Sequence, residues 1–405
     1  MSAVSTSGSP AVSAVPSGKP RVHIGYLDGL RALAAMFVVL HHSSTQFDLT
    51  HAPAPFAELL KFFSYGHYAV DIFIVLSGFC LMLPVALGDG TMRGSAASFF
   101  LKRARRILPP YYLALAFSLV LIYFFLSHAS GTRWDSTLPI TKQGVLLHLF
   151  LLQDVAGNFE INYPLWSIPV EWRIYFLFPV LVWAFRRYNP VAVTSVTVIA
   201  SYIVWLGIGH SPLNRWISTY PSGVSPYYLG LFAMGMLATK AAYSGDRSRA
   251  FGKPASAWAA ATAVSAFVVF ALSAFPLALG HSLPPQVMSL FVGLFSMTLL
   301  IWVSISPRSW AGRLFAWRPL VFLGTFAYSL YLTHAPLVQL FWQYVIHPLH
   351  LSDLAGFAMA IFVGAPLITG VAYVFHLACE RPFMNTKPRP TVAETERDAV
   401  LSPAP

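Results

Sequence analysis

The stretch YLDGLRALAAMFVVLHH, residues 26–42, places an aspartate, an arginine and two histidines in an otherwise apolar run. With the residues up to 47 it is long enough to cross a hydrocarbon core of about 30 Å as a helix. The sequence therefore predicts an all-α, polytopic membrane protein with about ten transmembrane helices in one bundle. The expected spans are 27–47, 68–87, 109–127, 166–186, 190–208, 225–242, 257–279, 286–305, 319–341 and 355–378.

The overall composition agrees with a membrane protein. Of the 405 residues, 56% are apolar and only 10% are charged, whereas a soluble protein of this length needs more surface charge. The net charge of +11 does not indicate nucleic acid as a partner, because basic loops on one side of a bilayer give the same balance. Cys80 and Cys379 lie in apolar runs and are interpreted as buried structural thiols, so neither a disulfide framework nor a metal site is predicted.

Two terminal tails flank the predicted membrane domain. Residues 1–22 are small, polar and interrupted by proline, and we expect them to be disordered, as we do residues 385–405. The first tail lacks the order of charged and apolar regions that marks a cleavable signal peptide. Residues 23–384 then form one transmembrane domain, in which 145–155 is too short to cross and is interpreted as an interfacial or re-entrant piece.

Lysine and arginine are divided unevenly between alternate connections. Twenty of the 26 fall on one side of the predicted membrane, two lie within spans (Arg31 and Arg173), and four fall on the other side: Lys61, Arg133, Lys142 and Arg215. Because basic residues accumulate in cytoplasmic loops, both termini are expected in the cytoplasm of a multi-pass protein of the inner (plasma) membrane.

The first predicted helix aligns two of its polar residues. Arg31 and His42 are eleven residues apart, which is about 1100° of rotation, so they lie within about 20° of one face. The rise between them is about 16 Å, which places Arg31 near the cytoplasmic end and His42 in the outer half. His41 is turned about 80° away. Two alternatives stay open: a salt bridge from Arg31 to Asp28, and a hydrogen bond from His42 to a neighbouring carbonyl.

Three further ionisable residues reach the same outer depth. Asp71 of YAVDIFIVLSGF and Glu171 of LWSIPVEWRIYF lie on helices that enter from outside, and His334 of YSLYLTH lies on a helix that rises from the cytoplasm. Ionisable groups inside a membrane are costly unless they are paired or face water, so together they predict a site in the bundle. Each alone could be a structural polar contact, and for Asp71 that alternative is as good as the functional one.

The segment FFLKRARRILPPYY, residues 99–112, concentrates positive charge on the cytoplasmic side. Arg103 and Arg106 share a face if the segment is helical, and paired guanidinium groups bind phosphates well. The alternative is membrane topology alone. Pro109 and Pro110 are predicted to restart the chain into the third helix.

In this order the motifs resemble acyltransferase family 3, bacterial membrane proteins that acylate hydroxyls of surface sugars and secreted metabolites. The resemblance covers about residues 26–383. It rests on Arg-x10-His (Arg31, His42), VDIFIVLSGF with Asp71, KRARRILPPYY with its Arg-x-x-Arg pair, LWSIPVEWRIYFLFP with Ser167 and Glu171, YSLYLTHAP, and the closing ERPF. The resemblance implies a cytoplasmic acyl-CoA donor as cosubstrate, no bound cofactor, and transfer near the outer face. Some relatives carry a soluble extracytoplasmic domain after the membrane domain, and we expect the reaction here to need only the membrane part.

The expected reaction is acyl transfer from a thioester to a sugar-type hydroxyl of a glycan or metabolite acceptor. Imidazole has a suitable pKa for a general base, so His42 is the candidate, oriented by Asp71 or Glu171, while a covalent acyl-histidine stays open. Neither cysteine is expected to carry the acyl group. The residues expected to bind donor phosphates are Arg31, Arg103 and Arg106, and those expected to bind or support the acceptor are Ser167, Trp166, Tyr175, Tyr331 and His334. Trp166, Trp172 and Tyr175 are equally typical of an interfacial aromatic belt.

Two other functions use similar residues. A proton-coupled secondary transporter or exporter also needs intramembrane histidine and carboxylates, although the sequence has no paired halves with broken helices. A flippase-like or non-catalytic acyl-lipid binder is the third reading. The acceptor, the acyl chain length and the oligomeric state stay open, and acetyl is the default donor group because it is common in the family.

Overall fold

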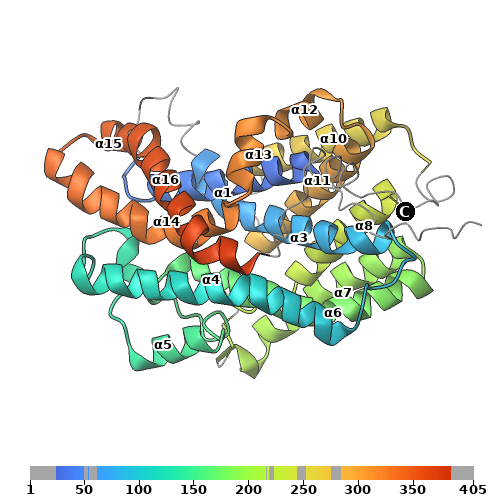
Figure 1. Ribbon diagram of the computed structural model, residues 1–405, viewed down its shortest axis with the longest axis horizontal. Coiled ribbons are helices and arrows are strands. Elements are labelled where there is room, and N and C mark those ends of the chain that lie inside the picture. The colour runs from blue at the N-terminus through green and yellow to red at the C-terminus, as the bar shows by residue number, and fades with distance from the viewer. Residues whose placement is uncertain are drawn as a thin grey trace, which may run out of the picture.

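The computed structural model describes residues 24–49, 53, 62–215, 217–218, 223–243, 252–274 and 284–384, and the predicted disordered tails lie outside them. Every regular element within these ranges is helical and none is a strand, which confirms the all-α prediction for this part of the chain (Figure 1). Seven of the described helices are long and apolar enough to cross a membrane, or up to eight if one bent pair counts as a single span.

The helices follow the predicted order along the chain. Their bounds are α1 (Gly25–Ser44), α3 (Ala69–Ala86), α4 (Ala96–Phe124), α5 (Lys142–Leu149), α6 (Ser167–Arg187), α7 (Pro190–His210), α8 (Tyr228–Tyr243), α10 (Ala255–Ala274), α11 (Pro285–Ile305), α12 (Trp310–Phe315), α13 (Arg318–Gly324), α14 (Ala327–Phe341), α15 (Asp353–Met359) and α16 (Ala365–Phe375). Three of the ten predicted spans are not among the seven: 319–341 is the bent pair, and 27–47 and 225–242 form as α1 and α8. The reasons for α1 and α8 differ. The first carries charged residues, and the second has 16 residues and is only about 24 Å long.

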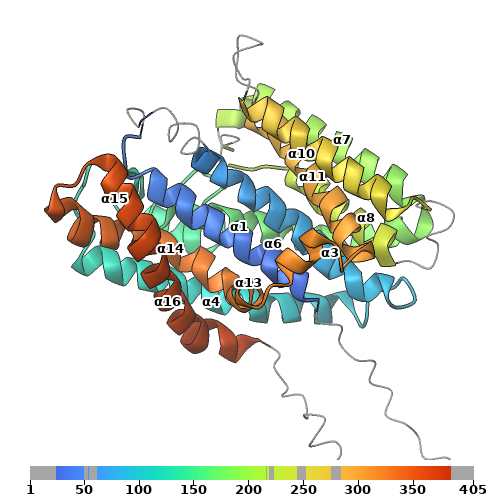
Figure 2. The same ribbon diagram turned by 90° about the horizontal axis from the view of Figure 1, so that it is seen from above.

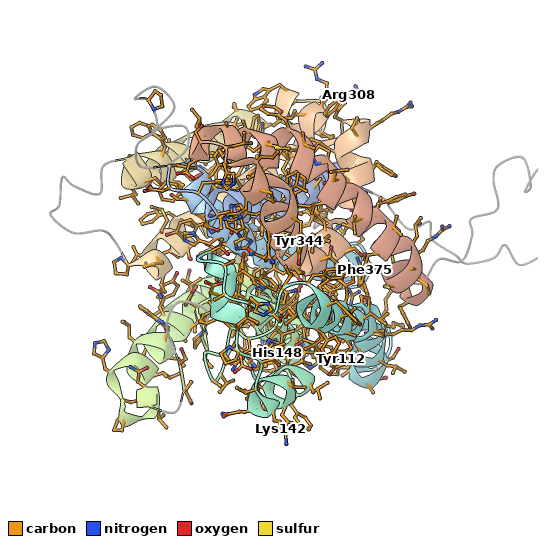
Figure 3. The ribbon with its side chains drawn as sticks, turned by 90° about the vertical axis from the view of Figure 1, so that its left-hand side faces the viewer. Tyr112, Lys142, His148, Arg308, Tyr344 and Phe375 are labelled. Atoms are coloured by element: carbon orange, nitrogen blue, oxygen red, sulfur yellow. The ribbon has the colours of Figure 1, made fainter. Side chains whose placement is uncertain are left out.

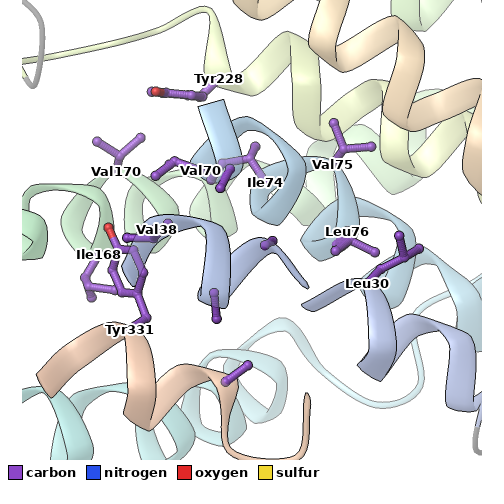
Figure 4. Packing of buried hydrophobic residues seen from close by; sticks show 14 of the residues in the cluster. Leu30, Val38, Val70, Ile74, Val75, Leu76, Ile168, Val170, Tyr228 and Tyr331 are labelled. Atoms are coloured by element: carbon purple, nitrogen blue, oxygen red, sulfur yellow. The ribbon is translucent and has the colours of Figure 1, made fainter. Parts of the chain in front are cut away.

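Helices α1 and α3 form the centre of the molecule. Helix α1 packs against α3, α12, α13 and α14, and α3 packs against α8 and α11 (Figure 2). Figure 4 shows Leu30 and Val38 of α1 beside apolar residues of α3 and α6. Glycines permit the closest approaches, since a Cβ on Gly29 would lie 1.8 Å from the Phe315 carbonyl oxygen.

Helix α4 is longer than predicted. It begins at Ala96, capped by the Ser95 hydroxyl, and runs unbroken through Pro109 and Pro110, so the prediction that these prolines restart the chain is wrong. Each proline removes a backbone donor, yet the helix continues to Phe124. Tyr111 and Tyr112 donate to the carbonyls of His148 and Leu149 of α5. Figure 3 labels Tyr112 and His148 in the lower part of its view.

The remaining differences concern breaks in the predicted helices. The expected helix 319–341 is two helices, α13 and α14, which meet at an angle of 74°. The expected last helix, 355–378, extends over Asp353–Phe383 and contains two π-helical turns, Ala360–Gly364 and His376–Glu380. The interfacial piece expected at 145–155 becomes α5 and a loop in which Leu151 has a φ of 56°.

Candidate functional site

A cavity of about 440 Å³ lies inside the bundle. Its walls come from α1, α3, α4, α6, α14 and the C-terminal end of the membrane domain, so it joins residues that are far apart in the sequence. Seven of the predicted site residues line it: Arg31, Arg103, Arg106, Ser167, Glu171, Tyr175 and Tyr331. The volume is within the range of sites that bind small molecules and cofactors, about 300–1,000 Å³.

Three arginines gather in one part of the cavity wall, which we call the arginine end: Arg31, Arg103 and Arg106. Arg103 and Arg106 lie one turn apart on α4, and the buried Nε of Arg103 has no hydrogen-bond partner among the described residues. Arg31 donates to Asp28 Oδ1 over 2.7 Å, so the alternative salt bridge is present. A second Arg31 donor lies 2.9 Å from Cys80 Sγ. Cys80 lines the cavity and is only partly buried, which corrects its interpretation as a buried structural thiol. The arginine end therefore concentrates donors for an anionic ligand.

Tyr331 forms the other part of the wall together with Ser167. The Tyr331 hydroxyl donates to the Pro164 carbonyl over 2.8 Å. Because that hydroxyl has one proton, the 2.6 Å contact between Ser167 Oγ and Tyr331 is a donation from the serine. Both hydroxyls are therefore held in fixed orientations.

Glu171 is held by a second set of hydroxyls. Tyr175 donates to Glu171 Oε1 in a short hydrogen bond and lies 2.9 Å from Ser77 Oγ. Since the tyrosine proton is already used, Ser77 is the donor in the latter contact. Glu171 lines the cavity and is not fully buried, so its carboxylate is available to a ligand there.

His42 and His334, which we call the histidine pair, meet between α1 and α14. Their rings stack at 4.9 Å, and His42 Nδ1 lies 2.7 Å from His334 Nε2. His334 Nδ1 lies 2.7 Å from the Tyr331 carbonyl, which can only accept, so this nitrogen carries the proton. In a neutral pair, His334 Nε2 then accepts from His42 Nδ1–H. This leaves the lone pair on His42 Nε2, which has no hydrogen-bond partner in the described part of the chain.

His41 is oriented differently. Its Nδ1 lies 2.8 Å from the carbonyl of Phe63, so it makes the hydrogen bond to a backbone carbonyl that was the alternative for His42. The two adjacent imidazoles thus face different partners, as the helical spacing predicts.

The histidine pair lies just outside the cavity lining. Tyr331 connects the two, because its ring lines the cavity while its carbonyl holds His334. The structure does not bring Asp71 to the pair. Asp71 is 1% exposed and lies beside Ser289 of α11 and Tyr228 of α8, and its Oδ2 has no hydrogen-bond partner among the described residues. Trp166 also lies away from the cavity lining, with its ring 6.0 Å from that of Tyr228.

Several lining residues were missed in the sequence. Glu380, Tyr328, Ser77 and Cys80 line the cavity, and Glu380 is almost completely buried. The closing ERPF motif contains Glu380 and was the signal for it, but the last span was expected to end two residues before it. No group of three or more His, Cys, Asp and Glu side chains that could hold a metal ion occurs among the described residues.

Comparison with known proteins decides the family. A family model described as an acyltransferase domain, acyltransferase family 3, matches residues 24–377. The chain belongs to this family. The acyltransferase domain thus covers nearly all of the described helices, and the chain is a multi-pass membrane protein.

Two of the relatives that match are named as peptidoglycan O-acetyltransferases of bacteria. The chain is 25% identical over 333 residues to the putative peptidoglycan O-acetyltransferase YrhL of Bacillus subtilis, covering 78% of this chain and 49% of the relative. It is 24% identical over 340 residues to the peptidoglycan O-acetyltransferase OatA of Listeria monocytogenes, covering 79% and 50%. The chain therefore spans about half the length of these relatives. No solved structure gives a significant match.

Proposed function

We propose that the chain is a membrane O-acyltransferase that moves an acyl group, acetyl by default, from cytoplasmic acyl-CoA to a hydroxyl of a cell-envelope glycan or glycosylated metabolite. The observation that carries the proposal is one cavity lined by both the arginine end and Tyr331, whose carbonyl holds His334 of the histidine pair. The names of the relatives, two of them peptidoglycan O-acetyltransferases, support a glycan acceptor.

His42 is the general base in this proposal. Its Nε2 removes the proton from the acceptor hydroxyl as the hydroxyl oxygen attacks the thioester carbonyl. When the tetrahedral intermediate collapses, the carbon–sulfur bond breaks, the new ester forms, and the imidazolium returns the proton to the CoA thiolate. His334 accepts the hydrogen bond from His42 Nδ1–H, so it orients the ring and stabilises the imidazolium.

Other residues bind the two substrates. The arginine end takes the phosphates of the donor, because guanidinium groups form strong charge-assisted hydrogen bonds with phosphate oxygens. Glu171, fixed by Tyr175, accepts a hydrogen bond from the acceptor sugar, and Ser167 and Tyr331 shape the wall beside it. Trp166, which lies outside the cavity lining, stacks on the acceptor sugar in this proposal. Asp71 acts through the position of α3, because it lies beside Ser289 and Tyr228 and not beside the histidine pair.

The membrane topology belongs to the same proposal. Ten spans with both termini in the cytoplasm put the arginine end inside and the histidine pair in the outer half, and the uneven distribution of lysine and arginine supports this orientation. Reporter fusions after Phe47 and after Trp134 are expected to map outside. A cytoplasmic reporter at either position would reverse the orientation and would contradict a cytoplasmic donor.

The central experiment is an acyl-transfer assay with the purified protein. With acetyl-CoA and a glycan acceptor, free thiol should appear in proportion to acceptor concentration, and mass spectrometry should find an acetyl ester on the acceptor. Envelope glycans and secreted metabolites from cells with and without the gene supply the candidate acceptors. Proton-coupled flux without thiol release would instead favour the transporter.

A further inference from the structure

Glu380 is a buried carboxylate in the wall of the cavity that the proposed reaction does not yet use. It is 2% exposed and ends the π-helical turn His376–Glu380. This turn packs against α4, the helix that carries Arg103 and Arg106. Ser329, which donates to Glu380, follows Tyr328, and the Tyr328 hydroxyl donates to the carbonyl of Ile107, the residue after Arg106. Glu380 therefore lines the cavity on the side of the arginine end.

Only one oxygen of Glu380 is occupied. Ser329 Oγ donates to Oε2 over 2.5 Å, and His376 Nδ1 lies 2.8 Å from the same atom. Glu380 Oε1 accepts no hydrogen bond from any described residue. The protein does not enclose this oxygen completely. A buried carboxyl oxygen needs a hydrogen-bond donor, and the cavity is where such a donor can reach it.

The chemistry of a carboxylate limits which group can be the hydrogen-bond donor. An ionised carboxylate is negatively charged, so it repels a phosphate group. It only accepts hydrogen bonds, so it binds an N–H or O–H group. The proposed acyl donor, acyl-CoA, has its phosphates at one end and its thioester at the other. Between them the pantetheine arm carries two amide N–H groups. A carboxylate placed next to the phosphate-binding arginines matches this intermediate part of the molecule.

We propose that Glu380 Oε1 accepts a hydrogen bond from an amide N–H of the pantetheine arm, while Ser329 and His376 hold the carboxylate in place. This assignment rests on the proposed function. It gives the cavity a recognition element for the arm in addition to the arginines for the phosphates. Glu380 is thus a donor-specificity residue and also joins α14 to the end of the membrane domain.

The decisive variant is Glu380→Gln. The amide oxygen can still accept from Ser329 and His376, but the amide N–H₂ then faces the cavity and opposes the pantetheine N–H. We expect the affinity for CoA to fall by roughly ten- to hundredfold, the range for a hydrogen bond to a charged group. The affinity for adenosine 3′,5′-bisphosphate, which has the phosphates but no arm, should not change. Glu160→Gln, on a loop carboxylate bonded to Thr141, is the matched control and should bind both ligands as the wild type does.

The measurements are isothermal titration and ligand-free thermal unfolding of the full chain in lipid nanodiscs. Equal CoA affinities of Glu380→Gln and wild type would overturn the assignment and leave Glu380 as a structural link. Equal losses for CoA and the bisphosphate would also overturn it, because they would place the contact on the adenosine bisphosphate part that both ligands share. A wild type that binds no CoA refutes the proposed function itself, and this assignment with it.

A test on the ligand avoids any loss of folding in the variant. In two CoA analogues, one or the other amide N–H of the arm is replaced by an ester oxygen. Wild-type protein should bind one analogue roughly ten- to hundredfold more weakly than CoA. Wild-type affinities equal to that for CoA with both analogues would refute the hydrogen bond.

Discussion

Substitution of the histidine pair tests the chemistry most directly. In the neutral pair, His334 uses one nitrogen to donate to Tyr331 and the other to accept from His42, so only His42 Nε2 can take a proton from a substrate. A general base of this kind typically contributes 10²–10⁴-fold to the rate. His42→Ala should therefore lower kcat by about that factor while CoA affinity is retained.

His334→Ala should give a smaller loss. It removes the acceptor for His42 Nδ1–H and leaves a buried donor unpaired, which costs about 1–3 kcal/mol, or roughly 5–150-fold. His334→Gln supplies a carbonyl oxygen that can accept the same hydrogen bond, so it should recover part of the activity. A merely structural role for His334 would lower the amount of folded protein without this difference in kcat.

His41→Ala is the internal control, because His41 is also buried but is bonded to the Phe63 carbonyl. It should keep substantial activity. The assay is thiol release from acetyl-CoA at saturating acceptor, normalised to folded protein in the membrane. Wild-type turnover in His42→Ala would refute the assignment of the base. Loss of activity in His41→Ala alone would show that His41, and not His42, is the general base.

Two further predictions concern the donor site and the packing of α1. Arg103→Ala and Arg106→Ala should each weaken CoA binding by roughly ten- to hundredfold, the loss of a charge-assisted hydrogen bond, whereas Lys102→Ala, exposed on the same helix and absent from the cavity lining, should not. The same CoA affinity in all three variants would reduce the arginines to topology signals. Gly29→Ala should lower the Tm measured in detergent, because its Cβ would lie 1.8 Å from a carbonyl oxygen, while Gly370→Ala, with no atom within 4 Å of the added Cβ, should leave it unchanged or slightly raised. Equal Tm values for the two variants would contradict the close contact of α1 with α12.

Part of the candidate site was predictable because helical geometry is local. The spacing of Arg31 and His42 places them along one face, and the turn between Arg103 and Arg106 brings both to the cavity once α4 is continuous. Glu171, four residues after Ser167 on α6, reaches the same cavity. In each case the relative positions within one helix follow from its rotation per residue.

Other features could not be predicted because they depend on contacts between helices. The predicted depth of Asp71 in the membrane is close to that of His42, but depth does not say which neighbour a side chain faces, and Asp71 faces Ser289 and Tyr228. The sequence likewise does not predict the break between α13 and α14, because a single glycine such as Gly324 can occur inside a helix. In the structure that glycine lets the chain approach the α1 backbone, since a Cβ there would lie 2.0 Å from the Asp28 carbonyl oxygen.

The sequence by itself determined that the chain is helical, crosses a membrane and carries the motifs of its acyltransferase family, because apolar run length and residue spacing are properties of a single segment. Only the tertiary structure decided that His42 pairs with His334, that Cys80 and Glu380 line the cavity, and that Asp71 lies elsewhere. The physical reason is that a polar group in a bundle takes the partner that packing brings within hydrogen-bond distance. Between segments hundreds of residues apart, that choice depends on close contacts such as those of Gly29 and Gly324 with neighbouring backbones.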